Sequence, residues 1–394
     1  MSRTAAAPPT IEAGGGGGAQ LAGAAAVPAS SVLTAASNYD GGAATAAPTP
    51  STATTAAGAP TSTAASPAAK ASAGATASAA AAGTAGSSKL GLLYAVTRGQ
   101  PTNYDMLVFR TLNRELGRPN ANADTLAARL RDELMPRRSW LLKHLPGSRA
   151  QLRRTLENPL WGVPGAVNFI DARTKWFDGA VTEALADGIQ QVVIVAAGYD
   201  TRAYRLGAPG VRFFEVDLPA ASSAKKALVE KLKFVEDPAR LPTFVAADLS
   251  RVSLAEALAG TAFEPSQRTL FTVEGLIYYL PQAAAGGLLA ALSGLAVPGS
   301  RVYFDFMSLD ALEGRGKFPG FKVTRKSVAN KGEPFLSGIG PSREAVAAAL
   351  APHGLGLRAF LAPKDMVGLM LPHESWSDSS PPIASFYYYA AADK

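Results

Sequence analysis

The pattern of apolar and polar positions changes twice along the chain, near residue 90 and again past Pro164, where a helical segment precedes the first strand. Between Tyr104 and about Arg154, apolar side chains recur at helical spacing, as at Leu126, Leu130 and Leu134. Several prolines divide this stretch into short segments. The pattern therefore predicts a cover of short helices. Its many arginines favour a solvated helical face over a polyanion-binding patch, since no aromatic residues are regularly interleaved with them.

Beyond residue 190, short apolar runs alternate with helical stretches. Residues 192–195 form a β-branched run, typical of a strand buried on both faces of a parallel sheet. Strands are predicted at 190–198, 211–217, 243–248, 270–274, 301–306, 357–371 and 384–391, and helices at 221–235, 252–260, 282–296 and 342–352, with a Gly/Lys-rich insertion at 316–340. Such alternation predicts an α/β fold: a doubly wound, mostly parallel sheet with helices on both faces.

The first 90 residues differ in composition from the rest. They hold 33 alanines, one aromatic residue (Tyr39) and five of the 69 charged residues of the chain. Ordering a backbone costs about 1–2 kcal/mol per residue, and this stretch has few large side chains to bury in return. We expect residues 1–90 to be a disordered tail and residues 91–394 to form one globular unit.

The tail has the composition of either a low-complexity linker or a transit peptide. It is rich in Ala, Ser and Thr and poor in acids, as transit peptides are, but it is also poor in arginine. It lacks the continuous apolar run of a secretory signal. We therefore expect an intracellular protein: cytoplasmic, or plastid or mitochondrial if the tail is a transit peptide.

The bulk composition excludes several kinds of site. The chain has no cysteine and three histidines, none at metal-ligand spacing, so no metal site is predicted. The net charge of +7 permits nucleic-acid or membrane-surface binding without requiring either, and we predict neither nucleic-acid binding nor membrane insertion. Residues 275–300 carry no charge, yet prolines and glycines interrupt them, so a strand end and a small helix explain them better than a membrane span.

Three acidic residues follow predicted strands: Asp217, Asp248 and Glu274. Right-handed crossovers bring the carboxyl ends of parallel strands to one edge, where such sheets bind ligands. After the first strand, Gly198 lies in a turn of small residues that lets a ligand approach the backbone. The dinucleotide fingerprint G-x-G-x-x-G is absent, because Ala196 takes its first position, and a ligand without phosphates is favoured. An ordinary tight turn is the alternative.

Each acid has a ligand-binding interpretation and a structural one. Asp217, 19 residues after Gly198, is placed to accept hydrogen bonds from ribose hydroxyls, or it caps a helix. Asp248, followed by Leu249, is placed to receive an adenine amino group, or it caps a helix together with Ser250. Glu274 lies in an apolar stretch, so its carboxylate needs a positively charged partner. That partner is either a cationic ligand or a nearby arginine, and the arginine would make a structural salt bridge.

Four segments in order resemble the leucine carboxyl methyltransferase-like family of S-adenosylmethionine-dependent O-methyltransferases: residues 197–206 (AGYDTRAYRL), 215–219 (EVDLP), 248–249 (DL) and 274–281 (EGLIYYLP). Residues 172–174 (ART) with Asp178 are similar to the segment that precedes the first strand in that family. The resemblance implies a Rossmann-like class I methyltransferase with a seven-stranded sheet. Residues 91–170 would be its helical cover, 171–310 its cofactor-binding core, and 311–394 its acceptor-side insertion and closing strands.

The resemblance also implies roles for single residues. Arg173 would pair with the methionine carboxylate of the donor, Gly198 would line the methionine moiety, and Glu274 would face it. Asp217 would hold the ribose, and Asp248 and Leu249 would frame the adenine. Asp200, in the first of the four segments, is a further candidate for cofactor binding. One departure is Ala196, where many relatives have glycine.

The implied activity is methyl transfer from S-adenosyl-L-methionine to an oxygen. No residue stands out as a general base, which favours a carboxylate or an acidic hydroxyl as acceptor, on a small molecule or at a protein C-terminus. No catalytic residue is assigned. The alternatives are a nicotinamide-dependent oxidoreductase, which the incomplete glycine fingerprint disfavours, and a nucleoside-binding module without turnover.

Overall fold

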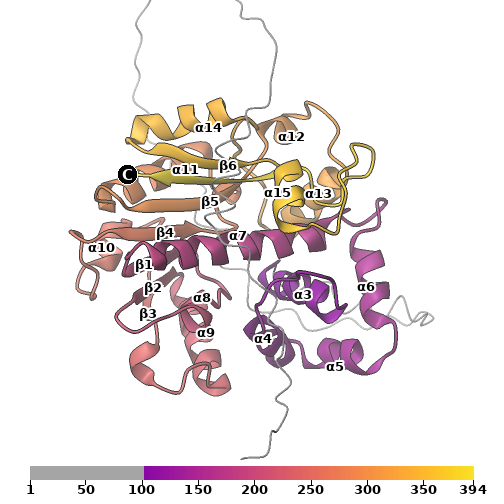
Figure 1. The fold of residues 1–394 in the computed structure, drawn as a ribbon, viewed down its shortest axis with the longest axis horizontal. Helices are drawn as coiled ribbons and strands as arrows, with labels where there is room; N and C mark the ends of the chain where they lie inside the picture. The colour runs from indigo at the N-terminus through magenta and orange to yellow at the C-terminus, as the bar shows by residue number, and fades with distance from the viewer. Residues whose placement is uncertain (1–101) are drawn as a thin grey trace, which may run out of the picture.

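A computed structural model describes residues 102–394, and the tail predicted at residues 1–90 lies outside this range (Figure 1). The strands are β1 (Gln191–Val195), β2 (Arg212–Asp217), β3 (Thr243–Ala246), β4 (Thr269–Val273), β5 (Arg301–Met307), β6 (Gly356–Leu361) and β7 (Tyr387–Asp393). They form one sheet in the order β3-β2-β1-β4-β5-β7-β6. β7 runs antiparallel to β5 and β6, and all other pairs are parallel. The predicted fold class is confirmed.

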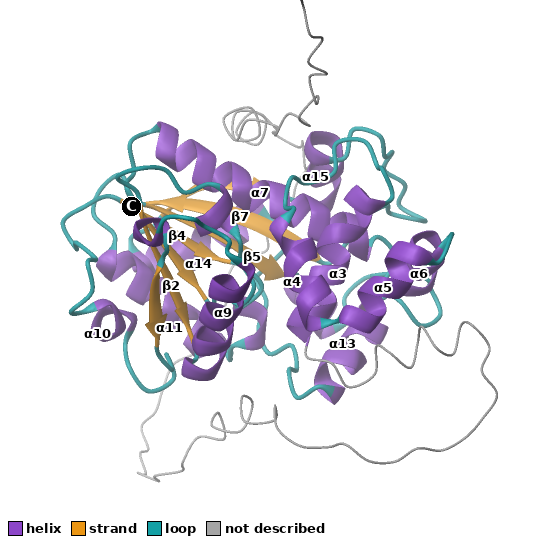
Figure 2. Cartoon of the chain, turned by 90° about the horizontal axis from the view of Figure 1, so that it is seen from below, coloured by secondary structure: helices purple, strands orange, loops and turns teal. Residues whose placement is uncertain are grey.

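Helices lie on both sides of the strands (Figure 2). The α-helices are α3 (Thr102–Glu115), α4 (Leu126–Leu134), α5 (Pro136–His144), α6 (Ser148–Leu156), α7 (Ala166–Ala186), α8 (Arg202–Arg205), α9 (Pro219–Leu232), α10 (Leu254–Leu258), α11 (Gln282–Leu295), α12 (Leu309–Glu313), α13 (Phe321–Asn330), α14 (Arg343–Leu350) and α15 (Pro363–Met370). The short 3₁₀ helices are η2 (Pro238–Arg240), η3 (Ile277–Tyr279) and η4 (Ala351–His353). Helices α3 to α6 gather beside the sheet as a helical cover (Figure 1). The divide expected at residue 170 falls inside α7, which the cover and the core share.

β1 is the centre of the core because both of its faces are buried. Successive side chains of a strand point to opposite faces. Val192 and Ile194 therefore belong to the cluster that includes Phe177 of α7, and Val193 and Val195 to the cluster on the other face. Every residue of β1 is buried, as the apolar run predicts for a central parallel strand.

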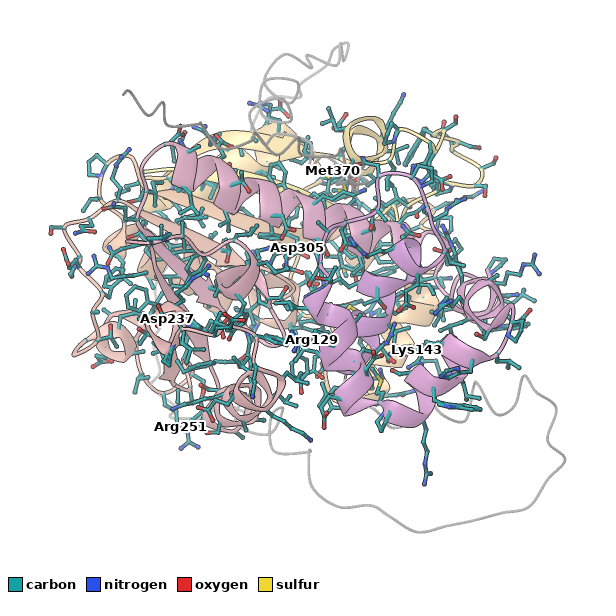
Figure 3. All side chains as sticks on the ribbon, turned by 60° about the horizontal axis from the view of Figure 1, so that its bottom comes forward. Arg129, Lys143, Asp237, Arg251, Asp305 and Met370 are labelled. Atoms are coloured by element: carbon teal, nitrogen blue, oxygen red, sulfur yellow. The ribbon has the colours of Figure 1, made fainter. Side chains whose placement is uncertain are left out.

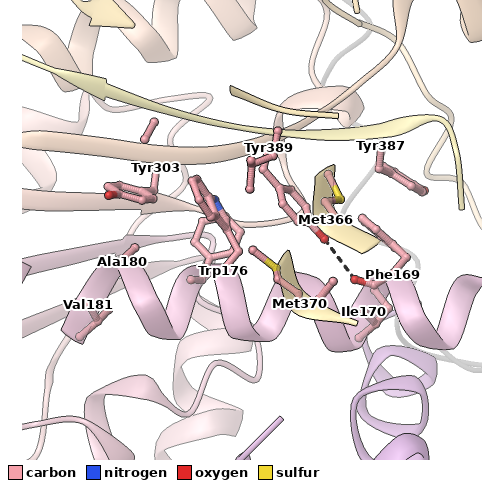
Figure 4. Close-up of a cluster of buried hydrophobic side chains, with 14 of the residues drawn as sticks. Phe169, Ile170, Trp176, Ala180, Val181, Tyr303, Met366, Met370, Tyr387 and Tyr389 are labelled. Carbon is pink, nitrogen blue, oxygen red and sulfur yellow. Dashed lines mark hydrogen bonds between the residues drawn. The ribbon is translucent and has the colours of Figure 1, made fainter. Parts of the chain in front are cut away.

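α7 is fixed against the antiparallel part of the sheet by aromatic side chains. Figure 4 shows the hydroxyl of Tyr389 on β7 donating to the carbonyl of Phe169 on α7, at 3.1 Å. Trp176, two turns further along α7, stacks on the same tyrosine with ring centroids 5.9 Å apart. The helix is thereby anchored at two points, and Arg173 lies between them.

Two details differ from the sequence prediction. The strand predicted at 357–371 ends at Leu361, and α15 follows it. Pro363 begins this helix, and Asp365 accepts a hydrogen bond from the amide of Ala362, so the sequence has a helix start that the apolar run obscured. The Gly/Lys-rich insertion contains α13.

Among residues 102–394, the helices are all too short or too polar to cross a bilayer.

Candidate functional site

The sheet register brings three strand ends level with one another. Val195, the last residue of β1, pairs with Val216 on β2 and with Val273 on β4. The next residues of the flanking strands are Asp217 and Glu274. Neighbouring strands lie about 4.8 Å apart, so these two acids lie on either side of β1, about 10 Å from each other. Chain order reverses between β1 and β4, which is where open α/β sheets bind ligands.

Asp217 is tied to the turn after β1. Its Oδ2 accepts a hydrogen bond from the amide of Gly198 at 2.6 Å, and its Oδ1 accepts one from the amide of Leu218 at 2.7 Å. Leu218 is the N-cap of α9, and no side chain caps that helix, so the helix-cap interpretation of Asp217 does not hold. Each carboxylate oxygen has two lone-pair sites. The half-buried carboxylate therefore keeps acceptor capacity for a ligand.

The turn after β1 has left-handed backbone at two residues. Gly198 has φ of 43°, and Ala196 has φ of 54°. For an L-residue this region costs roughly 1–2 kcal/mol, because Cβ crowds the following carbonyl oxygen. Ala196, which stands where many relatives have glycine, is therefore locally strained at the end of the central strand.

Asp248 is also at this edge, but its carboxylate accepts hydrogen bonds from the turn in which it lies. Oδ1 accepts hydrogen bonds from the amide of Ser250 at 3.0 Å and from its hydroxyl at 2.7 Å. These hydrogen bonds, with Arg251 nearby, hold the pKa of Asp248 below its usual range. Ser253 caps α10, so Asp248 stabilises a turn and not that helix. Leu249 is half-buried against the core, and the adenine-binding role of both residues stays a prediction.

Asp200 is engaged with Arg202. It is 5% exposed, its Oδ1 accepts the amide of Arg202 at 2.7 Å, and its Oδ2 pairs with the guanidinium of the same residue. This arrangement organises the start of α8. Binding of a cofactor by Asp200 stays a prediction.

Glu274 is held by three arginines. Its carboxylate lies 2.6 Å from Nη1 of Arg202, 3.0 Å from Nε of Arg173 and 3.7 Å from Nη2 of Arg110. Burial alone would raise the pKa of Glu274, but the three cations outweigh it and lower the pKa to about 2. The structural salt bridge considered from the sequence is therefore present, and the negative charge of Glu274 has its partners within the protein.

Arg173 has one nitrogen that no carboxylate of the described chain contacts. Its Nε pairs with Glu274, and its Nη1 donates to Asp305 Oδ2 and to the hydroxyl of Tyr278, both at 3.3 Å. Within residues 102–394, the polar contact of Nη2 is the sulfur of Met106 at 3.8 Å. A thioether is a weak acceptor, so Nη2 retains the capacity to bind the carboxylate of a ligand.

Sequence reasoning did not identify Arg110, Asp305 and Tyr278 as parts of this site. Asp305 carries a signal that could have been used, because it is an acid between two phenylalanines in the middle of a mostly apolar strand. Tyr278 lies within a motif but was given no role. Arg110 lies in a helix of the cover and gives no comparable signal, since its partners are far away in the sequence.

Comparisons with known proteins point to the same family as the motifs. Residues 109–293 match the model of the leucine carboxyl methyltransferase family, which confirms the resemblance over this stretch. A candidate S-adenosyl-L-methionine-dependent methyltransferase of Mycolicibacterium paratuberculosis is 43% identical over 148 residues, 37% of this chain and 46% of that protein. One of Frankia alni is 40% identical over 139 residues, 34% of this chain and 48% of that protein. The chain spans about half the length of the curated relatives it matches.

Among solved structures, the chain is similar to a candidate methyltransferase of Thermobifida fusca. The two are 16% identical, and the match covers 76% of this chain and 99% of the other, with a TM-score of 0.45.

Proposed function

We propose that this chain is a methyltransferase that uses S-adenosyl-L-methionine as its methyl donor. The observation that carries the proposal is the pairing of Asp217 with the turn at Gly198, together with Nη2 of Arg173, whose contact is the weak acceptor Met106, on the other side of β1. An adenosine linked to an amino acid carries both groups that these residues suit: ribose hydroxyls and a carboxylate. The names of the relatives support the same activity.

The residues of the rim would hold the donor at its two ends. Asp217 would accept the ribose hydroxyls with its remaining lone pairs, and Nη2 of Arg173 would donate to the donor's carboxylate. When bound, the donor supplies an electrophilic methyl group on a positively charged sulfur. The protein's main task is then to align the two reactants and to exclude water, which can lower the barrier by about 7–11 kcal/mol.

The acceptor would be an oxygen that is already acidic, either a carboxylate or an acidic hydroxyl. Burial raises the pKa of Tyr199, Tyr278 and Tyr279 well above the ordinary phenol value, so these side chains stay protonated at neutral pH. Glu274 is ion-paired with three arginines. The described side chains around the rim thus offer no evident general base, and an acceptor that is anionic at neutral pH needs none.

Two measurements test the proposal. Calorimetry should detect binding of S-adenosylhomocysteine to the full chain and no binding of a nicotinamide dinucleotide. Incubation with donor labelled in the methyl group and a panel of carboxylic acids, acidic phenols and peptides with a free C-terminus should then label an acceptor oxygen. Binding of the dinucleotide alone would favour the oxidoreductase alternative, and binding of S-adenosylhomocysteine without label transfer to any acceptor, host extract included, would favour the module without turnover.

A further inference from the structure

Asp305 is a fully buried carboxylate on β5, outside every motif of the sequence. Figure 3 shows it in the middle of the molecule, where the helical cover meets the sheet. Its Oδ1 accepts the amide hydrogen of Gly275 at 2.6 Å. Its Oδ2 accepts hydrogen bonds from Nη1 of Arg173 at 3.3 Å and from the hydroxyl of Tyr278 at 3.5 Å. One side chain thus joins α7, the end of β4 and η3.

A buried carboxylate such as Asp305 is an unfavourable choice for the stability of the folded state alone. Its neighbours along β5, such as Phe304 and Phe306, are buried and apolar. Taking a carboxylate out of water costs several kcal/mol, and well-packed apolar side chains in place of a buried ion pair are often neutral or stabilising. A role in orienting its partner accounts for the acid better than a role in holding the sheet together.

Arg173 is the partner that such orientation would serve. The guanidinium is a planar fork with fixed donor directions, so fixing two of its nitrogens also fixes the third. Glu274 lies 3.0 Å from Nε as an ion pair, and Asp305 accepts a hydrogen bond from Nη1. The ring of Phe169 lies 5.3 Å from the guanidinium carbon. Nη2 is left with the weak contact to Met106.

The packing around the guanidinium leaves it little room to move. A Cβ atom added at Gly275 would lie 3.3 Å from Nη1 of Arg173 and 3.5 Å from the hydroxyl of Tyr278. Gly275 also has φ of 72°, a left-handed conformation that suits glycine. The backbone that donates to Asp305 therefore closes over the same nitrogen that Asp305 binds.

We propose that Asp305 is a positioning residue that holds Arg173 with Nη2 directed to the carboxylate of the bound donor. This inference rests on the proposed function. Asp305 does not touch the reacting atoms, and it acts on the donor only through Arg173. Its loss should therefore lower the affinity for ligands that carry the amino-acid carboxylate and leave the affinity for ligands that lack it unchanged.

The test compares two ligands on the full chain: S-adenosylhomocysteine, which has the carboxylate, and methylthioadenosine, which lacks the amino-acid portion. Asp305→Asn keeps the size of the side chain and an acceptor for the amide of Gly275, but removes the charge that holds Arg173. We expect it to lower the affinity for S-adenosylhomocysteine by about tenfold or more, which is the scale of a charge-assisted hydrogen bond. The affinity for methylthioadenosine should fall by less than about twofold. In combination with Arg173→Met, Asp305→Asn should have little further effect, because the two residues act as one unit.

Glu183→Gln is the matched control. Glu183 is also a carboxylate at the interface of α7 and β5, and it contacts Arg301, Arg358 and the hydroxyl of Tyr303. It lies ten residues, or about 15 Å, along α7 from Arg173. Its replacement should leave the affinities for both ligands unchanged.

Several results would overturn the inference. Equal weakening of both ligands would mean that Asp305 supports only the fold, and no weakening of either would mean that Arg173 is oriented without it. If Asp305→Asn does not fold, as judged by circular dichroism, Asp305→Glu provides the same comparison, since it keeps the charge but displaces the carboxylate. If the unaltered chain binds neither ligand, the proposed function itself fails, an outcome distinct from the failure of this inference.

Discussion

The amide of Gly198 donates a hydrogen bond of 2.6 Å to Oδ2 of Asp217, although the two residues are 19 positions apart in the sequence. On the other side of the same turn, Nη1 of Arg202 pairs with Oε2 of Glu274 at 2.6 Å. The turn that follows β1 is thus fastened to the ends of both neighbouring strands. The edge that we propose binds the methyl donor is therefore largely formed in the protein without ligand, which lowers the ordering cost of binding.

Asp217→Ala should weaken the binding of S-adenosylhomocysteine by about 3–6 kcal/mol. The estimate corresponds to two hydrogen bonds between ribose hydroxyls and a charged carboxylate, at roughly 1.5–3 kcal/mol each. Calorimetry measures the change, and Asp237→Ala, at an exposed acid that caps η2, is the control. A loss below about tenfold in a variant with a native circular dichroism spectrum would show that Asp217 serves only to organise the turn.

Ala196→Gly should leave stability unchanged or raise it by up to about 1 kcal/mol. Relief of the left-handed strain at φ 54° offsets the greater freedom that glycine gives the unfolded chain. Ala197→Gly is the matched control, because residue 197 is buried and outside the left-handed region, and it should destabilise the protein. Urea unfolding of both variants gives the comparison. Equal destabilisation by the two substitutions would contradict the strain at Ala196.

Glu274→Gln should flatten the acid side of the pH–stability curve. The folded-state pKa of Glu274 is about 2, below the ordinary 4.5. The charged carboxylate thus stabilises the folded state at neutral pH, and this contribution is lost as the pH falls from about 4.5 towards 2. The expected size is on the order of a few kcal/mol, at 1.36 kcal/mol per pKa unit.

Urea unfolding at several acidic pH values checks this prediction. The exposed Glu236→Gln provides the control substitution. If the variant at residue 274 loses stability with falling pH as steeply as the unaltered chain, the ion pairs of Glu274 do not contribute as described.

The rate of methyl transfer to a carboxylate acceptor should be nearly independent of pH between about 6 and 9. Such an acceptor is ionised throughout this range, and no group of the protein has to remove a proton. Steady-state kcat measured across the range, with separate checks that the protein stays folded, tests the prediction. A steep rise near neutral pH would indicate a general base and would exclude this description of the acceptor.

The strands that carry the site could be predicted from the sequence because their signal is local. β1 and β4 are largely apolar runs, β2 combines Phe213, Phe214 and Val216 with polar residues, and the acids that end or follow β2 and β4 are visible without any tertiary information. α15 could not be predicted in the same way. Apolar residues lie on both sides of Pro363, from Ala359 to Leu371, and they outweigh the short helix-start signal that Pro363 and Asp365 provide.

The sequence by itself determined the alternation of strands and helices, the resemblance to a methyltransferase family, and the edge at which Gly198, Asp217, Asp248 and Glu274 lie. It did so because parallel strands with right-handed connections all end at the same edge. Only the tertiary structure decided what each acid binds. The sheet register places Asp217 where it accepts a hydrogen bond from the amide of Gly198 in the turn after β1. Asp248 instead accepts a hydrogen bond from the hydroxyl of Ser250. The partners of Glu274 and Arg173 come from segments far apart in the chain, and packing, which no local periodicity encodes, brings them together.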